Sequence, residues 1–516
     1  MNSETSKQTE VQNHTPSFYV KIYPCHKDSV IIDDQPQSSG APSTSKNRTD
    51  KQAENLEDYL LPIDRERRTT KPLLRYARSE FISNHSLEDD NEEPNIFEEA
   101  LNSDEKDEWL AAIKNEINSL HKNETLEFTG RPLNKGIIPS KWVYKKKFLG
   151  EKNEKVKFKV RLVAKGFKQK EGADYTEIFS PVVSTSIRVL LTIVTCEDLK
   201  LEQMDVTIAF LHGSLEEDLY MEQPKGFEAK GKIDLVCKLK KSLYGLKQSP
   251  RCWNKRFDDF INKIGFMRSL YDPCVYYKKL TNGSLIYLLL YVDDMLLAGK
   301  NLTKLNEIKE QLKNEFEMKD LGSAKRILGM EITRQRSIRG LFLSQKQYTK
   351  KVLAKFNMAN AKAVSTPVGQ QFKLSAKDSP NESTERQAMS NVPYSNAIGS
   401  LIHLMVCTRH DLAYNSSLVS RYMKNHGRNH WEATKWVFRY LVGIVNRGLL
   451  YAAPDEPKIL LKGYVDANFA GDCDKRRSLT GFSFTLGGNL ISWKTNLQLY
   501  QQFRSSKRGY MAKRFD

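Results

Sequence analysis

Two adjacent aspartates interrupt an otherwise apolar stretch of the chain. The stretch reads LLLYVDDMLLAGK over residues 288–300, and its aspartates are Asp293 and Asp294. Because an unpaired buried charge costs several kcal/mol, a chain that places two carboxylates there either puts them in a turn or uses them. Aspartate suits turns, but no glycine or asparagine stands beside the pair to take the positive φ of a two-residue turn. The pattern therefore favours a chemical role.

A second apolar strand-like stretch, EQMDVTIAFL, carries a third carboxylate, Asp205. If the two strands are neighbours, three carboxylates converge at one end of a sheet. They would repel one another and raise their pKa values unless a cation neutralised them. Mg²⁺ uses one or two carboxylates plus substrate phosphates, and a pair of ions roughly 3.5–4 Å apart promotes displacement at phosphorus. The chemistry alone leaves nucleotidyl transfer and phosphodiester hydrolysis both open.

The composition of the chain favours an anionic partner. Among 516 residues, Lys and Arg number 81 against 63 for Asp and Glu, a net charge of +18. Nucleic acid is the first partner that this charge suggests and a membrane surface the second. The longest apolar runs are far shorter than the ~20 residues of a membrane helix, and the seven scattered cysteines form no C-x-x-C pair. We expect a soluble protein in a reducing compartment, not secreted.

The elements that must position the carboxylates follow from the residue patterns. Residues 1–95 are polar and charged, and predict a disordered linker. The stretches SKWVYKKKFLG and KVKFKVRLVAKG alternate basic with apolar residues, and predict a hairpin with one basic face. Amphipathic helices and short strands then alternate irregularly, which predicts an α+β fold with an antiparallel sheet under helices. Helices with a basic outer face follow, and after Pro457 the pattern is that of a strand and a hairpin.

Four ordered blocks resemble the reverse transcriptase of copia-type LTR retrotransposons. They are RLVAKGFKQKEGADYTEIFSPVV, MDVTIAFLHGSLEEDLYMEQPKGF, KSLYGLKQSPRCW and YVDD. The resemblance implies an α+β right-hand polymerase, with fingers, a palm built on an antiparallel sheet, and a thumb, followed by a connection region and a partial ribonuclease H-like α/β domain. It divides the chain into a linker like the integrase–reverse transcriptase junction (1–95), fingers and palm (96–340), a mostly helical thumb and connection (341–457) and a truncated ribonuclease H-like segment (458–516). No integrase core, protease or zinc knuckle is present, so we expect a fragment of a Pol polyprotein.

The same resemblance implies roles for individual residues. Asp205, Asp293 and Asp294, with the backbone carbonyl of Val206, match the set that holds two Mg²⁺ ions, with Mn²⁺ as an alternative. Phe210 matches the aromatic residue that packs under the incoming sugar and selects deoxyribonucleotides. The other implied nucleotide-binding residues are Arg161, Lys147, Lys159, Tyr244 and Gly245. The implied primer grip is Leu328, Gly329 and Met330.

The C-terminal stretch departs from the family pattern. Asp466 matches the first catalytic carboxylate of ribonuclease H, but Gly509 stands where the family carries a glutamate. One carboxylate cannot hold two metal ions, so we expect no ribonuclease H activity.

The residues and the resemblance together support one main hypothesis and two alternatives. The main hypothesis is an RNA-directed DNA polymerase that uses dNTPs, an RNA template and a DNA primer, and binds the RNA–DNA hybrid, in the cytoplasm within a virus-like particle or in the nucleus. The first alternative is a degenerate or co-opted remnant that binds nucleic acid without catalysis. The second is a metal-dependent nuclease, which would leave the fingers and palm blocks unexplained. The sequence does not indicate an oligomeric state.

Overall fold

The structure is a computed structural model that describes residues 20–24, 93–133, 135–149, 155–179, 184–228, 234–454 and 459–498; the side chains of 20–24, 147–149 and 155 lie outside this description. Within these ranges the chain forms helices and mainly antiparallel sheets, so the predicted mixed organisation is confirmed. None of the helices there is both long enough and apolar enough to cross a bilayer.

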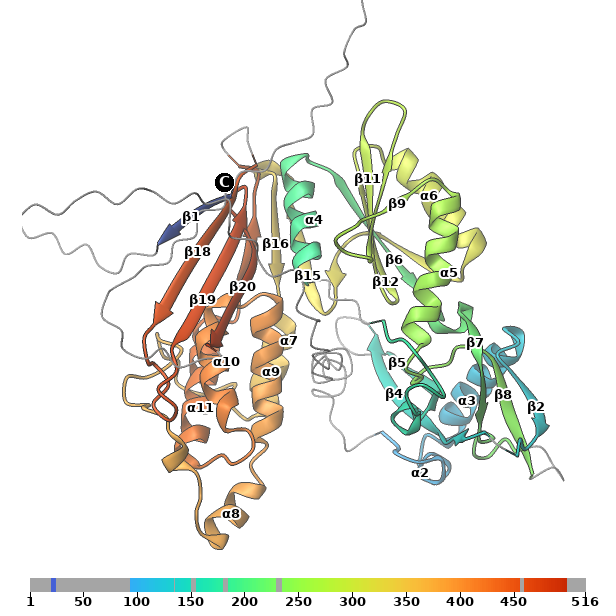
Figure 1. The fold of residues 1–516 in the computed structure, drawn as a ribbon, viewed down its shortest axis with the longest axis horizontal. Coiled ribbons are helices and arrows are strands. Elements are labelled where there is room, and N and C mark those ends of the chain that lie inside the picture. Colours follow the sequence, from blue (N-terminus) through green and yellow to red (C-terminus); the bar gives the residue numbers. More distant parts are fainter. Residues whose placement is uncertain are drawn as a thin grey trace, which may run out of the picture.

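A six-stranded antiparallel sheet, called the central sheet below, lies in the upper right of Figure 1. Its strands, in spatial order, are β13 (Met318–Ser323), β6 (Lys200–Val206), β12 (Asp294–Gly299), β11 (Leu285–Tyr291), β10 (Val275–Lys279) and β9 (Met267–Arg268). Successive side chains of β12 point to opposite faces, and both faces are covered. Met295 and Leu297 pack with helices α5 (Ser249–Lys263) and α6 (Leu302–Glu315). Burial on both faces explains why the strand is continuously apolar after Asp294 rather than alternating.

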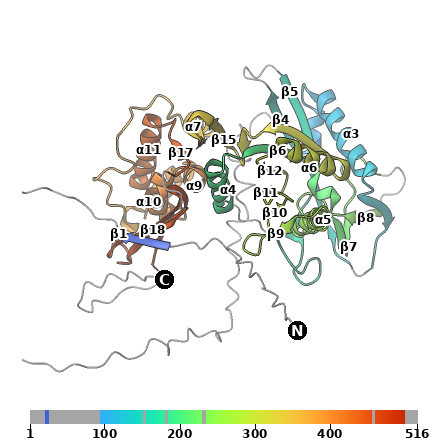
Figure 2. The ribbon, with the colours of Figure 1, turned by 90° about the horizontal axis from the view of Figure 1, so that it is seen from above.

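Helix α4 (Ser184–Cys196) covers the other face of this sheet. Leu296 and Ala298 of β12 join the cluster of buried residues that α4 contributes to. Figures 1 and 2 both show α4 between the central sheet and the C-terminal part of the chain. The helix carries apolar residues almost all round, as a helix enclosed on several sides must.

A hairpin of β4 (Ser140–Leu149) and β5 (Lys155–Ala164) confirms the predicted basic ribbon. Its apolar face packs on helix α3 (Lys106–Lys122), whose Trp109 ring lies 4.7 Å, centroid to centroid, from Phe158. The opposite face carries Arg161 and Lys159, because alternate residues of a strand share a face.

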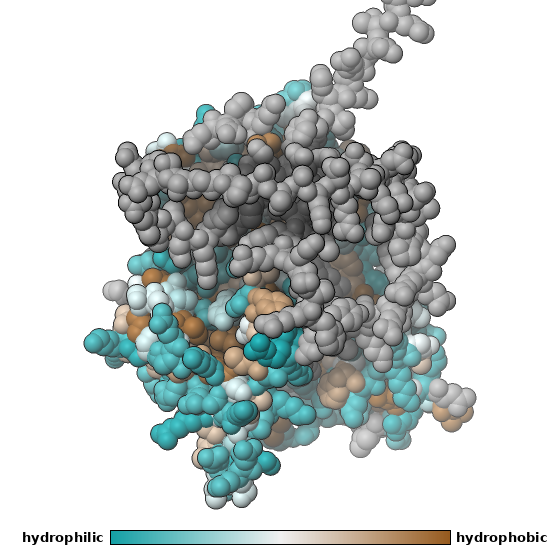
Figure 3. Space-filling view, turned by 60° about the vertical axis from the view of Figure 1, so that its left-hand side comes forward, coloured by the Kyte–Doolittle hydropathy of each residue, from teal (hydrophilic) through white to brown (hydrophobic). Residues whose placement is uncertain are grey.

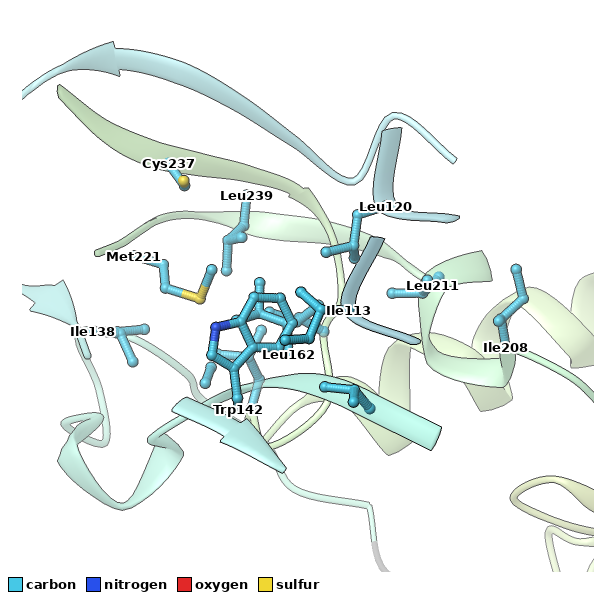
Figure 4. Close-up of a cluster of buried hydrophobic side chains, with 14 of the residues drawn as sticks. Ile113, Leu120, Ile138, Trp142, Leu162, Ile208, Leu211, Met221, Cys237 and Leu239 are labelled. Atoms are coloured by element: carbon cyan, nitrogen blue, oxygen red, sulfur yellow. The ribbon is translucent and has the colours of Figure 1, made fainter. Parts of the chain in front are cut away.

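A small sheet completes the N-terminal core. Its strands, in spatial order, are β2 (Leu126–Gly130), β8 (Leu235–Lys241), β7 (Ser214–Met221) and β3 (Ile137–Ile138). Figure 4 shows Trp142 of β4 at the centre of this core, among side chains from the hairpin, α3 and the small sheet. The short helix α2 (Phe97–Leu101) precedes α3.

A third sheet joins the central sheet to a group of helices. Its strands are β14 (Arg326–Ile327), β15 (Met330–Gln335), β16 (Gly340–Ser344) and β17 (Gly448–Tyr451). The helices between β16 and β17 are α7 (Lys346–Lys355), α8 (Ser383–Ser390), α9 (Tyr394–Cys407), α10 (Ala413–Val419) and α11 (Arg428–Gly443). Helix α8 buries none of its residues. In the space-filling view of Figure 3, mainly hydrophilic residues cover the lowest part of the molecule.

The last sheet contains the predicted C-terminal strands, β18 (Leu461–Asn468), β19 (Leu479–Leu486) and β20 (Asn489–Leu497). Strand β1 (Val20–Pro24) pairs in parallel with β18 (Figure 2). The expectation of a disordered linker over residues 1–95 is therefore wrong for this short stretch, because the open edge of β18 offers backbone partners to an extended segment. Most of the remaining linker lies outside the described residues, and so does Gly509.

Arg188 of α4 ties three elements together. Its guanidinium donates to the carbonyl oxygens of Cys407 in α9 and Ile491 in β20, each at 3.1 Å, and also to Val406. The same group stacks 3.9 Å from the ring centroid of Trp493 in β20. Arg188 is 4% exposed, so these contacts replace its hydration almost completely.

We predict that Arg188→Met lowers the free energy of unfolding by about 3 kcal/mol, because buried carbonyl oxygens lose a charged donor. Differential scanning calorimetry of the whole chain measures the change as a lower Tm. Lys424→Met, at an exposed position, is the control and should leave Tm nearly unchanged. Equal Tm values for the two variants would show that Arg188 does not hold α4 against α9 and β20.

Candidate active site

Asp293 lies in the turn between β11 and β12, and Asp294 is the first residue of β12. Tyr291 pairs with Asp294, so Val292 and Asp293 form a two-residue turn. Val292 has φ of 53° and is the only β-branched residue among the positive-φ, non-glycine positions that the structure describes. Contrary to the expectation from the sequence, this turn therefore does not require glycine or asparagine. A valine takes the left-handed conformation, which costs energy and persists only where surrounding contacts hold it.

Asp205 lies opposite Asp294 in the antiparallel pair of β6 and β12. One residue further along, the Val206 N–H donates to the Asp293 carbonyl oxygen at 2.9 Å. Asp205 and Asp294 are therefore a non-hydrogen-bonded pair, the arrangement that brings opposed side chains closest. Both carboxylates are on the face of the sheet that α4 covers, because Leu201 and Leu296 on the same faces of their strands pack there.

Burial, with a smaller contribution from neighbouring aspartates, raises the pKa values of Asp293 and Asp294. Burial raises the pKa of Asp293 to about 6. The positive charges of Arg161 and Lys159 oppose this rise, while the negative charges of the neighbouring aspartates add to it. Burial also raises the pKa of Asp294 to about 6, with a further contribution from Asp205. A pair of acids with raised pKa values at one edge of a sheet is a common mark of a functional site.

The segment predicted as a primer grip reaches the same carboxylates. Leu328 and Gly329 form the turn between β14 and β15, with φ of 48° and 75°. The backbone of Leu328, as a hydrogen-bond donor, partly offsets the rise in the pKa of Asp294. Met330, by contrast, is 3% exposed and packs in the core beside α4, so its side chain faces away from solvent.

Three of the predicted nucleotide-binding side chains contact one another. The Arg161 guanidinium carbon lies 4.0 Å from the ring centroid of Tyr244. The Tyr244 ring also meets Phe210 edge to face, with centroids 5.3 Å apart. Burial raises the pKa of Tyr244, and the charge of Asp293 raises it further, so the two groups are close enough to interact electrostatically.

Gly245 allows the loop that carries Tyr244 to approach β5 closely. Its φ is 91°, and a Cβ atom there would lie 2.1 Å from the carbonyl oxygen of Ala164. The Ala164 N–H in turn donates to the Tyr244 carbonyl oxygen at 2.8 Å. Any side chain at position 245 would push this loop away from the strand that carries Arg161.

The remaining predicted residues are placed differently. Lys159 shares the basic face of the hairpin with Arg161, and its charge acts on Asp293. Lys147 is on the same face by register, but its side chain lies outside the described residues. Asp466 is exposed on β18, which belongs to another sheet, so the structure does not bring it to the other carboxylates.

The donor chemistry of the three aspartates fits a hard divalent cation. Ionised carboxylates are acceptor-only groups, and the buried Oδ1 of Asp293 has no hydrogen-bond partner. A cation with oxygen ligands would satisfy this atom and offset the burial and repulsion that raise both pKa values. In the described ranges, however, no three His, Cys, Asp or Glu side chains gather as ligands of one ion. The site therefore has suitable donors on adjacent strands, without the closed geometry of a bound metal.

Sequence reasoning missed two residues at this site. The Gln203 side chain, as a hydrogen-bond donor, lowers the pKa of Asp294, and its position two residues before Asp205 on the same strand face could have indicated it. Trp253 packs in the apolar core beneath α5, as its place in an amphipathic helix predicts, but its indole N–H also donates to the Val292 carbonyl oxygen at 2.8 Å. No local pattern signals a contact between residues 39 positions apart.

Comparisons with known proteins identify the family of the chain. A family model described as reverse transcriptase (RNA-dependent DNA polymerase) matches residues 123–370, which include the three aspartates. The retrovirus-related Pol polyprotein from transposon TNT 1-94 of Nicotiana tabacum is 46% identical over 452 residues, 87% of this chain and 33% of that protein. The corresponding polyprotein from transposon RE2 of Arabidopsis thaliana is 37% identical over 79% of this chain and 27% of its own length.

Other matches differ in coverage. The chain spans about a third or less of these Pol polyproteins, but it covers 92% of a putative transposon Ty5-1 protein of Saccharomyces cerevisiae, at 30% identity over 57% of this chain. The solved foamy viral protease-reverse transcriptase in complex with double-stranded DNA matches with a TM-score of 0.39 and 11% identity, covering 76% of this chain and 56% of that one. That likeness is too weak to support an argument. On the family model and the relatives, the chain belongs to the reverse transcriptase family of copia-type transposons, and resembles the matching part of their retrovirus-related Pol polyproteins.

Proposed function

We propose that the chain is an RNA-directed DNA polymerase that transfers a nucleotide from a dNTP to a primer 3′-hydroxyl. The observation that carries this proposal is the direct opposition of Asp205 and Asp294 on adjacent strands, with Asp293 in the turn beside them. Family membership supports the reaction class, and the Arg161 side chain supplies a positive charge that acts on Asp293.

Asp205, Asp293 and Asp294, with the Val206 carbonyl, would hold two Mg²⁺ ions, or Mn²⁺ in their place. When bound, such ions acidify the primer hydroxyl and neutralise the departing pyrophosphate. The protein holds these carboxylates on paired strands, so little reorganisation is required of them during the reaction. Leu328 and Gly329 would place the primer end at the same point, because their turn adjoins Asp294.

Arg161 would bind the triphosphate of the dNTP through its guanidinium fork. Tyr244 keeps this group in place by stacking, and Lys159 and Lys147 would add positive charge from the same hairpin face. Phe210 would pack under the sugar and exclude a 2′-hydroxyl. Its edge-to-face contact with Tyr244 supports this role, since that contact restricts movement of the ring.

The fold suggests a right-hand organisation. The β4–β5 hairpin with α3 would form the fingers, and the six-stranded sheet with α4, α5 and α6 the palm. Helices α7 to α11 would form the thumb and connection, and β18 to β20 a ribonuclease H-like sheet. We propose that this last sheet lacks ribonuclease H activity, because the sequence has glycine at position 509 instead of a second acid.

The proposed partners are an RNA template, a DNA primer and their hybrid. The net charge of +18 and the basic hairpin face support binding to a phosphate backbone, which depends on charge and shape more than on sequence. We propose the cytoplasm, within a virus-like particle, or the nucleus as the place of action, since both supply nucleic acid.

We predict that Asp293→Asn lowers primer extension on a poly(rA)–oligo(dT) template with Mg²⁺ by roughly a thousandfold, because several kcal/mol of charge stabilisation is lost. Asp259→Asn removes an exposed carboxylate of α5 and is the matched control, with activity expected near that of the wild type. Gel analysis of extended primers measures both rates.

Other outcomes of this assay separate the alternatives. A wild-type chain that binds the hybrid but never extends the primer would contradict the polymerase and indicate a binding remnant. Strand cleavage that depends on Asp293 would indicate a nuclease.

The raised pKa of Asp293, about 6 against an ordinary 3.8, predicts a pH-dependent stability difference. Between these two values the folded protein keeps a proton that the unfolded chain has lost. Without metal, the free energy of unfolding therefore falls as the pH rises from about 4 to about 6, and the full penalty remains above about 6. Asp293→Asn removes the penalty, so its Tm should exceed that of the wild type at about pH 7.5 and the advantage should shrink towards about pH 4.

Thermal melts in EDTA at several pH values measure this difference. Mg²⁺ should then raise the Tm of the wild type more than that of the variant, because the ion binds only the folded carboxylates. A Tm advantage that is the same at every pH would show that Asp293 does not titrate as proposed.

A further inference from the structure

The strained turn at Val292 is held by a side chain from α5. The indole Nε1 of Trp253 donates to the Val292 carbonyl oxygen at 2.8 Å. The next carbonyl oxygen of the turn, that of Asp293, accepts from the Val206 N–H at 2.9 Å. Both carbonyl groups of the turn are therefore bound from outside the hairpin, one by a side chain and one by the neighbouring strand.

This turn needs such external support. Valine at φ of 53° places its branched Cβ against the backbone, and a conformation of this kind is kept only when its surroundings determine it. Without the indole contact, the Val292–Asp293 peptide could rotate towards conformations that valine prefers. Such a rotation would carry the Asp293 side chain with it, because the two residues share that peptide.

Trp253 is itself a rigid donor. It is 2% exposed, and its ring packs on Phe257 and Phe316 with centroids 5.6 Å and 5.2 Å away. Helix α5 begins at Ser249, whose hydroxyl donates to the Leu243 carbonyl oxygen at 2.6 Å. The start of the helix is thus fixed beside the loop that carries Tyr244, and the indole has little freedom to follow the turn if the turn moves.

We propose that Trp253 is a positioning residue of the active site: its indole N–H holds Val292 in the left-handed conformation and thereby aims the Asp293 carboxylate. The consequence for catalysis rests on the proposed polymerase function. The consequence for the turn itself does not, because the hydrogen bond and the backbone conformation belong to the free protein.

The test compares Trp253→Phe with Trp142→Phe. Both substitutions keep a buried aromatic ring and remove one N–H bond to a backbone carbonyl, since Trp142, labelled in Figure 4, is 5% exposed and donates to the Lys225 carbonyl oxygen at 3.0 Å. Of these two tryptophans, only Trp253 donates a hydrogen bond to the β11–β12 turn that carries Asp293. Trp253→Phe should lower kcat for primer extension about tenfold to a hundredfold and raise the Mg²⁺ concentration for half-maximal rate, with KM for dNTP nearly unchanged. Trp142→Phe should leave the Mg²⁺ requirement unchanged.

A double-mutant cycle with Val292→Gly tests the proposed cause. Glycine adopts positive φ without a steric penalty, so the turn no longer depends on the indole bond. The effect of Trp253→Phe on the Mg²⁺ requirement should therefore be much smaller in the Val292→Gly background. An undiminished effect there, or an equal effect of Trp142→Phe, would overturn the proposal.

Hydrogen–deuterium exchange separates this inference from the proposed function. In metal-free protein, peptides covering residues 291–295 should exchange faster in Trp253→Phe than in the wild type, and at the wild-type rate in Trp142→Phe. If the wild type extends no primer but this difference appears, the polymerase proposal fails and the positioning role stands. If primers are extended but exchange at the turn is the same in all three proteins, the positioning role fails and the function stands.

Discussion

Repulsion between carboxylates that the protein cannot fully hydrate is the interaction on which this site depends. Asp205 and Asp294 face each other in the closer kind of antiparallel pair, and Asp293 joins them from the turn. Water would screen such charges, but the sheet around them is apolar on both faces. The packing of the sheet must then offset the free-energy cost of this repulsion. It has to be stable enough to keep the three carboxylates together before any cation binds.

The packing that does this extends well beyond the sheet. On one side, Lys309 of α6 is 2% exposed and bonds Glu202 of β6 at 2.5 Å and Asp320 of β13 at 3.1 Å. This buried pairing fixes α6 against the strand that carries Asp205. On the other side, α4 lies between the sheet and the C-terminal helices, where Arg188 contacts α9 and β20. The carboxylate edge is thus held between two layers whose own contacts are charged and directional, which resist sliding better than apolar contacts alone.

Much of this organisation could be predicted from residue patterns, and the limit has a physical cause. The hairpin with a basic face, the apolar strands and the approach of Asp205 to the aspartate pair follow from the two-residue period of strands. The conformation of Val292, the approach of Leu328 to Asp294 and the indole bond of Trp253 do not, because they depend on contacts between distant segments. Arg188 is the extreme case, since one of its acceptors lies 303 positions away. The short strand at Val20–Pro24 escaped notice for a related reason: its partner edge is at the far end of the chain.

The position of β6 between two partners restricts how this gene can vary in length. Asp205 stands opposite Asp294 on one side and Lys319 on the other. Inserting a single codon ahead of it within the strand would rotate the aspartate to the side of α5 and α6, and inserting two would restore its direction but move it out of line with both neighbours. Substitutions in this strand can be absorbed one at a time, whereas a change in its length cannot. Related transposons should therefore differ in the identity of the residues in this strand long before they differ in the number of residues in it.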